Sequence, residues 1–178
     1  MKLVSFGVME MLMPFRKVAT SDGPLKFNEQ WDIKELVSNR QDITAVTPLT
    51  ADLSAEFREG DVVDVHGKLT VGVDMLCSRC LKPINEHFHI DFHEQFKQGK
   101  QPEDLHEDDD TLYVDGDSVD LKGYAEEAFL LDLPFIPLCS DTCKGLCPKC
   151  GHELNEGDCG CDNQVIDPRL AGLKDFFK

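Results

Sequence analysis

The residues of this chain best suited to chemistry are eight cysteines, which occur as four close pairs. The pairs are Cys77 and Cys80, Cys139 and Cys143, Cys147 and Cys150, and Cys159 and Cys161. Two pairs supply four thiolates, and four thiolates complete a tetrahedral zinc shell. The sequence therefore predicts two zinc ions, or one if a single shell forms. A shell filled by four sulfurs has no open position for catalysis, so such sites would stabilise a fold or shape a binding surface.

The cysteines can be sorted into sites in more than one way. In Cys147-Pro148-Lys149-Cys150-Gly151, a glycine after the second cysteine permits the left-handed backbone that such a turn often requires. We assign Cys147, Cys150, Cys159 and Cys161 to one zinc site, and Cys77, Cys80, Cys139 and Cys143 to the other. A competing arrangement places one ion among Cys139, Cys143, Cys147 and Cys150 and leaves Cys77 and Cys80 without metal.

Three other interpretations of the cysteines stay open at this point. A Cys-x-x-Cys pair can be a redox dithiol, although neither such pair here opens a helix after a strand. Four cysteines can also bind iron in the manner of rubredoxin. Cys77 continues the apolar face of a predicted strand and could be a buried core thiol, but the neighbouring Cys80 favours a ligand role.

Beyond the cysteines, the sequence offers no catalytic constellation. It lacks a Gly-rich phosphate loop, a nucleophile elbow and a His-Glu-x-x-His motif. His87, His89 and His93 share the polar face of one predicted strand, which is typical of a solvated surface. We therefore predict that the protein is not an enzyme.

Alternating apolar residues predict an antiparallel sheet. Residues 49–57, 63–77 and 84–96 each place apolar side chains at every second position, and Arg58-Glu59-Gly60-Asp61 forms a turn between the first two runs. The three runs predict a β-meander or partial barrel with one buried face. Cys77 and Cys80 fall in the turn between the second and third strands, where the backbone can curl around an ion.

Helices are expected beside this sheet, which makes the fold class α+β. Asp32 and Glu35 have capping-box spacing, so a short helix ending near Arg40 is predicted. Asp120 is suited to cap a helix over residues 121–129. Before it, Tyr113-Val114 is predicted to form a short strand. Residues 167–177 predict a C-terminal helix, and the apolar residues 1–15 predict a strand or helix of the fold rather than a signal peptide.

Length and composition indicate one main domain with a small appendage. The chain has 178 residues, of which 41% are hydrophobic and 29% charged. We predict an α+β core domain at residues 1–138, with an acidic loop near 101–120, followed by a Cys-rich zinc-binding segment and C-terminal helix at 139–178. No apolar stretch reaches the ~18 residues of a membrane span, so we expect no membrane contact. Paired, reduced cysteines favour a cytoplasmic protein.

The charge of the chain is strongly one-sided. The formal net charge is −16, and residues 101–120 carry nine acidic residues and no Lys or Arg. Such a field repels nucleic-acid phosphates and attracts basic partners, although the acidic loop could also be a solvated segment. Direct RNA binding would need a local basic patch. The basic residues near the cysteines are the candidates for partner binding: Arg79, Lys82, Lys144, Lys149 and Arg169, with Lys174 nearby.

Several motifs together resemble the YceD family, whose members are named large ribosomal RNA subunit accumulation proteins. The motifs are Cys77-Ser-Arg-Cys80-Leu-Lys-Pro83, Leu133-Pro-Phe-Ile-Pro-Leu-Cys139, Cys143-Lys-Gly-Leu-Cys-Pro-Lys-Cys-Gly151 and Ile166-Asp-Pro-Arg-Leu-Ala171. The resemblance extends from about Asp32 to Leu173. It implies a role in processing or accumulation of large-subunit ribosomal RNA, with the family's first cysteine pair at Cys77 and Cys80. Some members lack the tail that holds Cys147 to Cys161, which implies a structural or accessory role for that site.

Together these features predict a non-enzymatic factor in ribosome assembly. It would bind a basic large-subunit ribosomal protein through its acidic surface, or ribosomal RNA through the basic residues beside the cysteines. The alternative is a redox-sensing zinc-thiolate regulatory protein that releases zinc on oxidation. A nuclease-like processing enzyme is a third hypothesis, which the lack of an open metal site disfavours. No oligomeric state is indicated.

Overall fold

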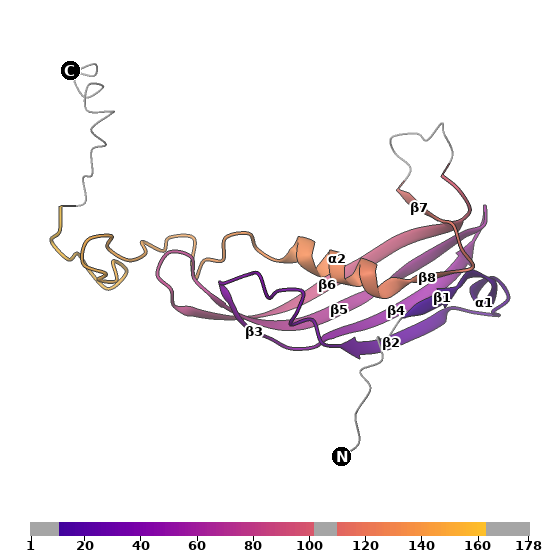
Figure 1. The fold of residues 1–178 in the computed structure, drawn as a ribbon, viewed down its shortest axis with the longest axis horizontal. Coiled ribbons are helices and arrows are strands. Elements are labelled where there is room, and N and C mark those ends of the chain that lie inside the picture. The colour runs from indigo at the N-terminus through magenta and orange to yellow at the C-terminus, as the bar shows by residue number, and fades with distance from the viewer. Residues whose placement is uncertain (1–10, 102–109, 163–178) are drawn as a thin grey trace, which may run out of the picture. The chain divides into compact units, whose positions relative to one another are not determined.

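A computed structural model describes residues 11–101 and 110–162 of the chain (Figure 1). It divides into two compact units. The sheet unit comprises residues up to Met75 together with Asn85–Phe135, and the cysteine unit comprises Leu76–Ile84 together with the chain from Ile136 onward. The predicted C-terminal helix, most of the N-terminal segment, Arg169 and the centre of the acidic loop lie outside the described residues.

The sheet unit is built on a curled six-stranded sheet, which confirms the predicted α+β class and partial barrel (Figure 1). Its strands are β2 (Leu25–Trp31), β3 (Ile43–Val46), β4 (Leu49–Arg58), β5 (Val62–Leu76), β6 (Pro83–Gln98) and β7 (Thr111–Val114). The order is β2-β4-β5-β6-β7, and β3 pairs with β5. The predicted meander is therefore β4-β5-β6. β7 runs parallel to β6, whereas the pairs of β5 with β3 and β4, and of β2 with β4, are antiparallel.

Strict alternation in β4 and β5 creates the buried face of the sheet. The core side chains on these strands are Leu49, Ala51, Leu53 and Ala55 on β4 and Val63, Val65, Leu69, Val71, Val73 and Met75 on β5. Ile90, Phe92 and Phe96 continue this face on β6. Phe57 was expected to face inward but is 45% exposed, because it is the second-last residue of β4 and lies beyond the buried part of that strand. Ile84 and Phe88 of β6, which alternation also predicts to face inward, are only partly buried.

One glycine in β5 allows the neighbouring backbone to approach closely. Gly67 pairs with Leu53 of β4, and a Cβ atom added to Gly67 would lie 2.1 Å from the backbone oxygen of Asp52. No side chain fits there without moving β4. Gly67 is therefore needed for the curl of the sheet at this point.

β3 and β4 follow the same edge of β5, with a break between them at Thr47 and Pro48. Proline has no N–H to donate to a strand ladder. Thr47 compensates on both sides of the break: its N–H donates to the Gly72 oxygen at 2.9 Å, and its hydroxyl accepts from the Gly72 N–H at 2.8 Å.

The helix predicted after Asp120 is present as α2 (Leu121–Asp132) (Figure 1). The Asp120 carboxylate caps it by accepting from the backbone N–H of Lys122 at 3.0 Å. Leu121, Ala125 and Phe129 are its buried side chains. The ring of Tyr124 meets Phe96 of β6 edge-on, with centroids 4.9 Å apart, so α2 packs on the sheet.

Three small elements lie at or near the start of α2; the first falls within the strand or helix predicted for residues 1–15, and the other two were not predicted. β1 (Leu12–Pro14) pairs antiparallel with β8 (Ser118–Asp120), and α1 (Phe15–Ala19) follows β1. The carboxylate of Asp120 also accepts from the Met11 N–H at 3.0 Å. One side chain therefore holds the beginning of α2 and the chain that enters β1.

The helix predicted for residues 32–40 is wrong, because this segment forms successive turns. The N–H groups of Leu36, Ser38 and Arg40 donate to carbonyls three residues earlier, at 2.9–3.3 Å. Asp32 accepts from the Lys34 N–H, as a capping residue would, but no α-helix follows. Ile33 and Val37 are buried, so packing of these two side chains fixes the segment without a regular helix.

Two glycines of the sheet unit give opposite predictions for replacement by alanine. Gly67→Ala should lower the free energy of unfolding by about 1–3 kcal/mol, because the new methyl group overlaps backbone atoms of β4. Gly123→Ala should raise it by about 0.5–1 kcal/mol, because Gly123 lies inside α2 with open space around it. Urea unfolding followed by circular dichroism measures both, and equal effects would contradict the close approach at Gly67.

Candidate metal centres

The eight cysteines lie in the cysteine unit as two groups of four. The first group is Cys77, Cys80, Cys139 and Cys143, and the second is Cys147, Cys150, Cys159 and Cys161; within each group all sulfurs lie within 4.8 Å of one another. These are the two sets predicted from spacing. The competing single site, which would combine the Cys139 and Cys147 pairs, does not occur among the described residues.

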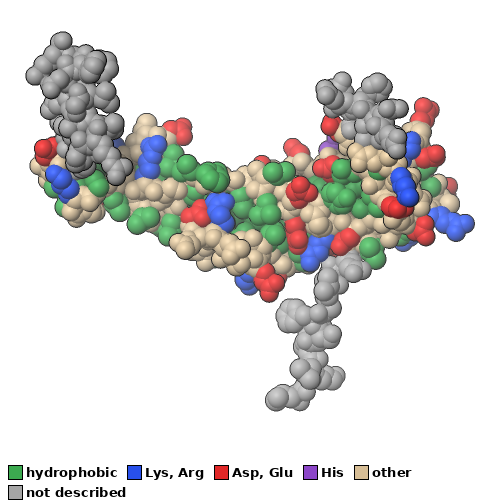
Figure 2. All heavy atoms as spheres, turned by 45° about the horizontal axis from the view of Figure 1, so that its top comes forward, with side chains coloured by type: hydrophobic (Ala, Val, Ile, Leu, Met, Phe, Trp, Pro, Cys, Tyr) green, Lys and Arg blue, Asp and Glu red, His purple; other side chains and the backbone are tan. Residues whose placement is uncertain are grey.

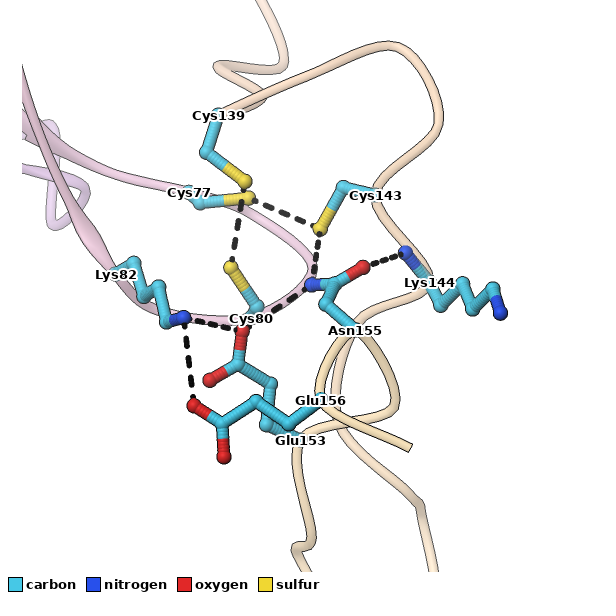
Figure 3. Close-up of polar contacts among 9 residues, drawn as sticks. All are labelled: Cys77, Cys80, Lys82, Cys139, Cys143, Lys144, Glu153, Asn155 and Glu156. Atoms are coloured by element: carbon cyan, nitrogen blue, oxygen red, sulfur yellow. Dashed lines mark hydrogen bonds and ion pairs between the residues drawn. The ribbon is translucent and has the colours of Figure 1, made fainter. Parts of the chain in front are cut away.

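The sulfur spacing in the first group fits one tetrahedral ion (Figure 3). The Sγ atoms of Cys77 and Cys143 are 3.8 Å apart, and those of Cys80 and Cys139 are 3.6 Å apart. A zinc–sulfur bond of about 2.3 Å in a tetrahedron gives sulfurs about 3.8 Å apart. A disulfide would bring two sulfurs to about 2.05 Å, and all eight cysteines are free thiols.

The end of β5 and the start of β6 position the first pair. Cys77 follows β5, its N–H donates to the Lys82 oxygen at 2.8 Å, and its oxygen accepts from the Leu81 N–H at 2.9 Å. These bonds close a tight turn that aims both sulfurs the same way. Leu81 takes a left-handed backbone with φ 61°, which a residue with a Cβ adopts only at a cost of about 1–2 kcal/mol.

The second group begins with the same turn. The Cys147 N–H donates to the His152 oxygen and the Gly151 N–H to the Cys147 oxygen, each at 2.8 Å. Gly151 has φ 73° and holds the position that Leu81 has in the first turn. The left-handed geometry predicted from Gly151 therefore occurs in both cysteine turns, and only the second uses glycine for it.

Cys159 and Cys161 complete the second group from a tight loop. Gly160, between them, has φ 71°, and its N–H donates to the Asp158 carboxylate at 3.0 Å. This left-handed residue allows two cysteines separated by a single residue to turn toward the same point.

A hairpin links the two groups. Leu146 and Glu153 form an antiparallel bridge, with the second cysteine turn at its tip. From the returning strand, the Asn155 amide donates to the Cys143 sulfur at 3.4 Å, and its oxygen accepts from the Lys144 N–H at 2.7 Å (Figure 3). Asn155 therefore fixes a ligand of the first group from the hairpin that carries the second. Sequence analysis did not identify it, because an isolated asparagine gives no spacing signal.

Glycine is also required where this hairpin passes the first turn. Gly145 has φ 77°, and a Cβ added there would lie 2.9 Å from the Arg79 oxygen. The same oxygen accepts from the Leu146 N–H at 3.0 Å. The backbone of the hairpin thus lies directly against the turn between Cys77 and Cys80.

In the metal-free protein the thiols of each group differ in acidity. Burial raises the pKa of Cys77, but hydrogen bonds from backbone N–H groups outweigh it and lower that pKa to about 6. Backbone N–H groups likewise lower the pKa of Cys147 to about 6. Neighbouring cysteines raise the pKa values of Cys139 and Cys161 to about 12, because a second thiolate beside the first is unfavourable. A bound cation removes this repulsion and displaces the remaining protons.

The basic residues predicted to bind a partner are largely engaged within the cysteine unit. Arg79 donates to the Cys143 oxygen at 2.7 Å, and Lys82 pairs with Glu153 at 2.6 Å and with Glu156 at 3.8 Å. Lys149 donates to the Asp162 oxygen. Figure 3 shows the Lys144 ammonium pointing away from the sulfurs.

The three predicted surface histidines lie on β6. His87 and His89 line a hollow of about 170 Å³ with Gly72, Thr50 and Thr70. His93 has a specific partner: its Nε2 lies 2.7 Å from Oδ1 of Asp64, which is 8% exposed. Burial raises the pKa of Asp64, but His93, His66 and Arg58 together outweigh this effect and lower it. None of the histidines belongs to a metal-binding group in the part of the chain that the structure describes.

Gly145 and Gly151 make a matched pair for testing this architecture. Replacement by alanine should cost each about 1–2 kcal/mol of stability, because both have a left-handed backbone. Gly145→Ala should cost more and weaken metal binding at the first group, because its methyl group would also press on the Arg79 oxygen, whereas Gly151 has nothing within 4 Å. Urea unfolding of the metal-loaded variants compares them. A Gly151→Ala effect as large as that of Gly145→Ala would contradict the contact.

Among the described residues, no helix is both long and apolar enough to cross a membrane. No solved structure gives a significant match to the chain.

Comparisons with known sequences identify relatives of the chain. The chain is 31% identical over 159 residues to the uncharacterized protein YlbN of Bacillus subtilis, covering 86% of this chain and 88% of that protein. It is 32% identical over 132 residues to the uncharacterized protein ML1660 of Mycobacterium leprae, covering 73% and 59%. It is 36% identical over 102 residues to the uncharacterized protein Rv2926c of Mycobacterium tuberculosis, covering 57% and 49%. The chain thus spans between about half and three fifths of the length of these mycobacterial relatives.

The family match includes both cysteine groups. Residues 65–177 match the family described as "Large ribosomal RNA subunit accumulation protein YceD". This confirms the resemblance drawn from the cysteine motifs: the chain belongs to the YceD family.

Proposed function

We propose that this protein is a non-enzymatic factor in the accumulation and processing of large-subunit ribosomal RNA, which acts by binding a ribosomal component. The observation that carries the proposal is the family match over residues 65–177, a family named for ribosomal RNA accumulation. The two groups of four sulfurs agree with a binding role, because four thiolates around one ion leave no position for a reacting water or substrate.

We propose zinc as the ion of both groups. In the first group, the Sγ atoms of Cys77 and Cys143 are 3.8 Å apart and those of Cys80 and Cys139 are 3.6 Å apart, and in both groups all four sulfurs lie within 4.8 Å of one another. These distances match the tetrahedral all-sulfur environment that zinc favours. The ions would be structural. Among the described residues of the cysteine unit, the apolar cluster consists of Cys77, Cys80 and Cys143, with Ile84, Leu138 and Leu146 packed against them, which is a small core for the described segment.

The charge distribution favours a basic protein over RNA as the direct partner. The described residues of the sheet unit contain about twice as many Asp and Glu as Lys and Arg. In the cysteine unit, Arg79, Lys82 and Lys149 already donate to groups of the same unit. A phosphate backbone would therefore meet a repulsive field with few unengaged cations, whereas a basic ribosomal protein would be attracted.

Metal analysis of single-cysteine variants tests the two zinc sites. The purified wild-type chain should contain two zinc ions, and Cys80→Ser and Cys150→Ser should each contain one, because each removes one sulfur from a different group. Elemental analysis by mass spectrometry after gel filtration measures the ratio. Ser78→Ala is the control and should retain both ions. An unchanged zinc content in either cysteine variant would contradict the assignment of that group.

Depletion of the protein in cells tests the ribosomal role. The ratio of mature large-subunit to small-subunit ribosomal RNA should fall, and wild-type protein should restore it, whereas a Cys77→Ser, Cys80→Ser variant should not, because the first metal centre would be lost. Northern blotting or long-read RNA sequencing measures mature and precursor species. Ser78→Ala serves as the matched control. A normal ratio after depletion would refute the proposal, and cleavage of precursor RNA by the purified protein would refute its non-enzymatic part.

A further inference from the structure

The end of α2 exposes three large apolar side chains within six residues. Leu130 is 43% exposed, Leu131 is 80% exposed and Phe135 is 91% exposed, all within the sheet unit. We call these three residues the α2-end surface. Single exposed apolar residues are common on protein surfaces, whereas several exposed apolar side chains close together are typical of an interaction site. Figure 2 shows hydrophobic side chains reaching the surface among Asp and Glu side chains on the face that it presents.

The backbone beneath the α2-end surface is held in place. Leu133, between Leu131 and Phe135, is only 7% exposed, so the segment alternates outward, inward and outward. Arg40 donates to the Pro134 oxygen at 2.9 Å, and its guanidinium is in turn held by two contacts with the Asp42 carboxylate, at 2.8 and 2.6 Å. The apolar side chains are therefore presented on a fixed backbone, and a partner would not have to order it on binding.

The charges around this surface are negative. Glu127 precedes Leu131 by four residues, so the two are neighbours on the surface of α2, and Asp132 follows directly. The last turn of α2 contains no basic residue of its own, and the guanidinium of Arg40, which donates to the Pro134 oxygen just beyond the helix, is already paired with the Asp42 carboxylate. Burial raises the pKa of Glu94 on β6, and the charges of Glu127 and Asp110 raise it further, which shows that acidic groups are crowded beside the helix.

The combination of exposed apolar side chains with the acidic side chains of Glu127 and Asp132 defines the kind of partner that fits. We propose that the α2-end surface docks a segment of a basic large-subunit ribosomal protein in which apolar side chains alternate with Lys or Arg. The apolar side chains cover Leu131 and Phe135, and the cations meet Glu127, Asp132 and the end of α2. This inference rests on the proposed function, and it names the surface and the chemistry of the partner.

Other occupants fit the surface less well. RNA would bring phosphates toward Glu127 and Asp132, and three aliphatic or aromatic side chains do not offset that repulsion. A second copy of the chain would bring the same acidic groups face to face on a protein of net charge −16. The C-terminal segment, with Leu173 and Phe176, carries three basic residues against two acidic ones between residues 163 and 178, so its charge complements Glu127 and Asp132 only weakly.

Direct binding measurements test the inference. Large-subunit ribosomal proteins, purified one at a time and free of RNA, are titrated into the full-length zinc-loaded chain and followed by fluorescence anisotropy. At least one should bind, and a Leu131→Ser, Phe135→Ser variant should weaken it about tenfold or more, the usual effect of removing central apolar anchors. Phe57→Ser is the matched control, because Phe57 is an exposed aromatic residue of the same unit far along the chain from α2, and it should change nothing.

A charge variant separates the two components of the surface. Glu127→Gln with Asp132→Asn keeps the apolar side chains, so it should weaken binding at low salt and have little effect at high salt, since exposed charges are screened there. The inference is overturned if every large-subunit protein binds the double variant Leu131→Ser, Phe135→Ser as tightly as it binds the wild-type chain. It is equally overturned if that variant instead weakens binding of protein-free large-subunit ribosomal RNA.

Two further outcomes would assign the surface to this chain itself. Dissociation of a wild-type dimer by Leu131→Ser, Phe135→Ser in sedimentation analysis would identify a second copy as the occupant. Tighter partner binding by a Leu173→Ser, Phe176→Ser variant would identify the C-terminal segment as a competing occupant and overturn an open docking surface. Both measurements use purified protein. The docking inference can therefore fail while ribosomal RNA accumulation in cells still depends on the protein, and the proposed function can fail while the surface still binds a ribosomal protein.

Discussion

The cysteine unit depends on one physical constraint: four sulfurs must converge on each of two points. In the part of this unit that the structure describes, the buried apolar cluster consists mainly of the cysteines themselves, with Cys77 and Cys143 almost completely buried. In the absence of a cation, thiols this close repel one another once ionised, which is why the pKa values of Cys139 and Cys161 are raised to about 12. A bound cation displaces the remaining protons and offsets the repulsion among the thiolates, so the four sulfurs of a group can be ionised together when metal is bound.

The two cysteine groups are not independent in structure. The turn at Cys77–Lys82 and the turn at Cys147–His152 use the same pair of backbone hydrogen bonds. The hairpin between Leu146 and Glu153 carries the second turn and returns Asn155 to the Cys143 sulfur of the first group. Lys82, beside the first turn, pairs with Glu153 of the hairpin. The backbone of one cysteine group is therefore connected to the other by a short hairpin, a hydrogen bond and an ion pair. The sheet unit has a separate hydrophobic core.

Sequence reasoning succeeded where a pattern is periodic or chemically specific. Alternation predicted β4, β5 and β6, Asp120 predicted the start of α2, and cysteine spacing predicted the two groups that the structure brings together. It failed at residues 32–40, because capping-box spacing does not decide between a helix and successive turns once Ile33 and Val37 are packed. It also missed β2, where Glu29 interrupts the apolar side of the strand, β3, which is only four residues long, and the role of Asn155, which depends on tertiary contact. The exposure of Leu131 and Phe135 was equally invisible, because an apolar residue near a helix end reads as core.

We propose that bound metal, rather than an apolar core, holds the cysteine unit together, whereas the sheet unit is held by its own apolar core. Hydrogen–deuterium exchange of the full-length protein, with zinc bound and after removal by a chelator, tests this most directly. We expect amides of the cysteine turns at Cys77, Leu81, Cys147 and Gly151 to lose protection on metal removal, and amides of β4 and the part of β5 before Met75 to keep it. Unchanged protection of the cysteine turns without metal, or a simultaneous loss of protection throughout the sheet, would contradict the account.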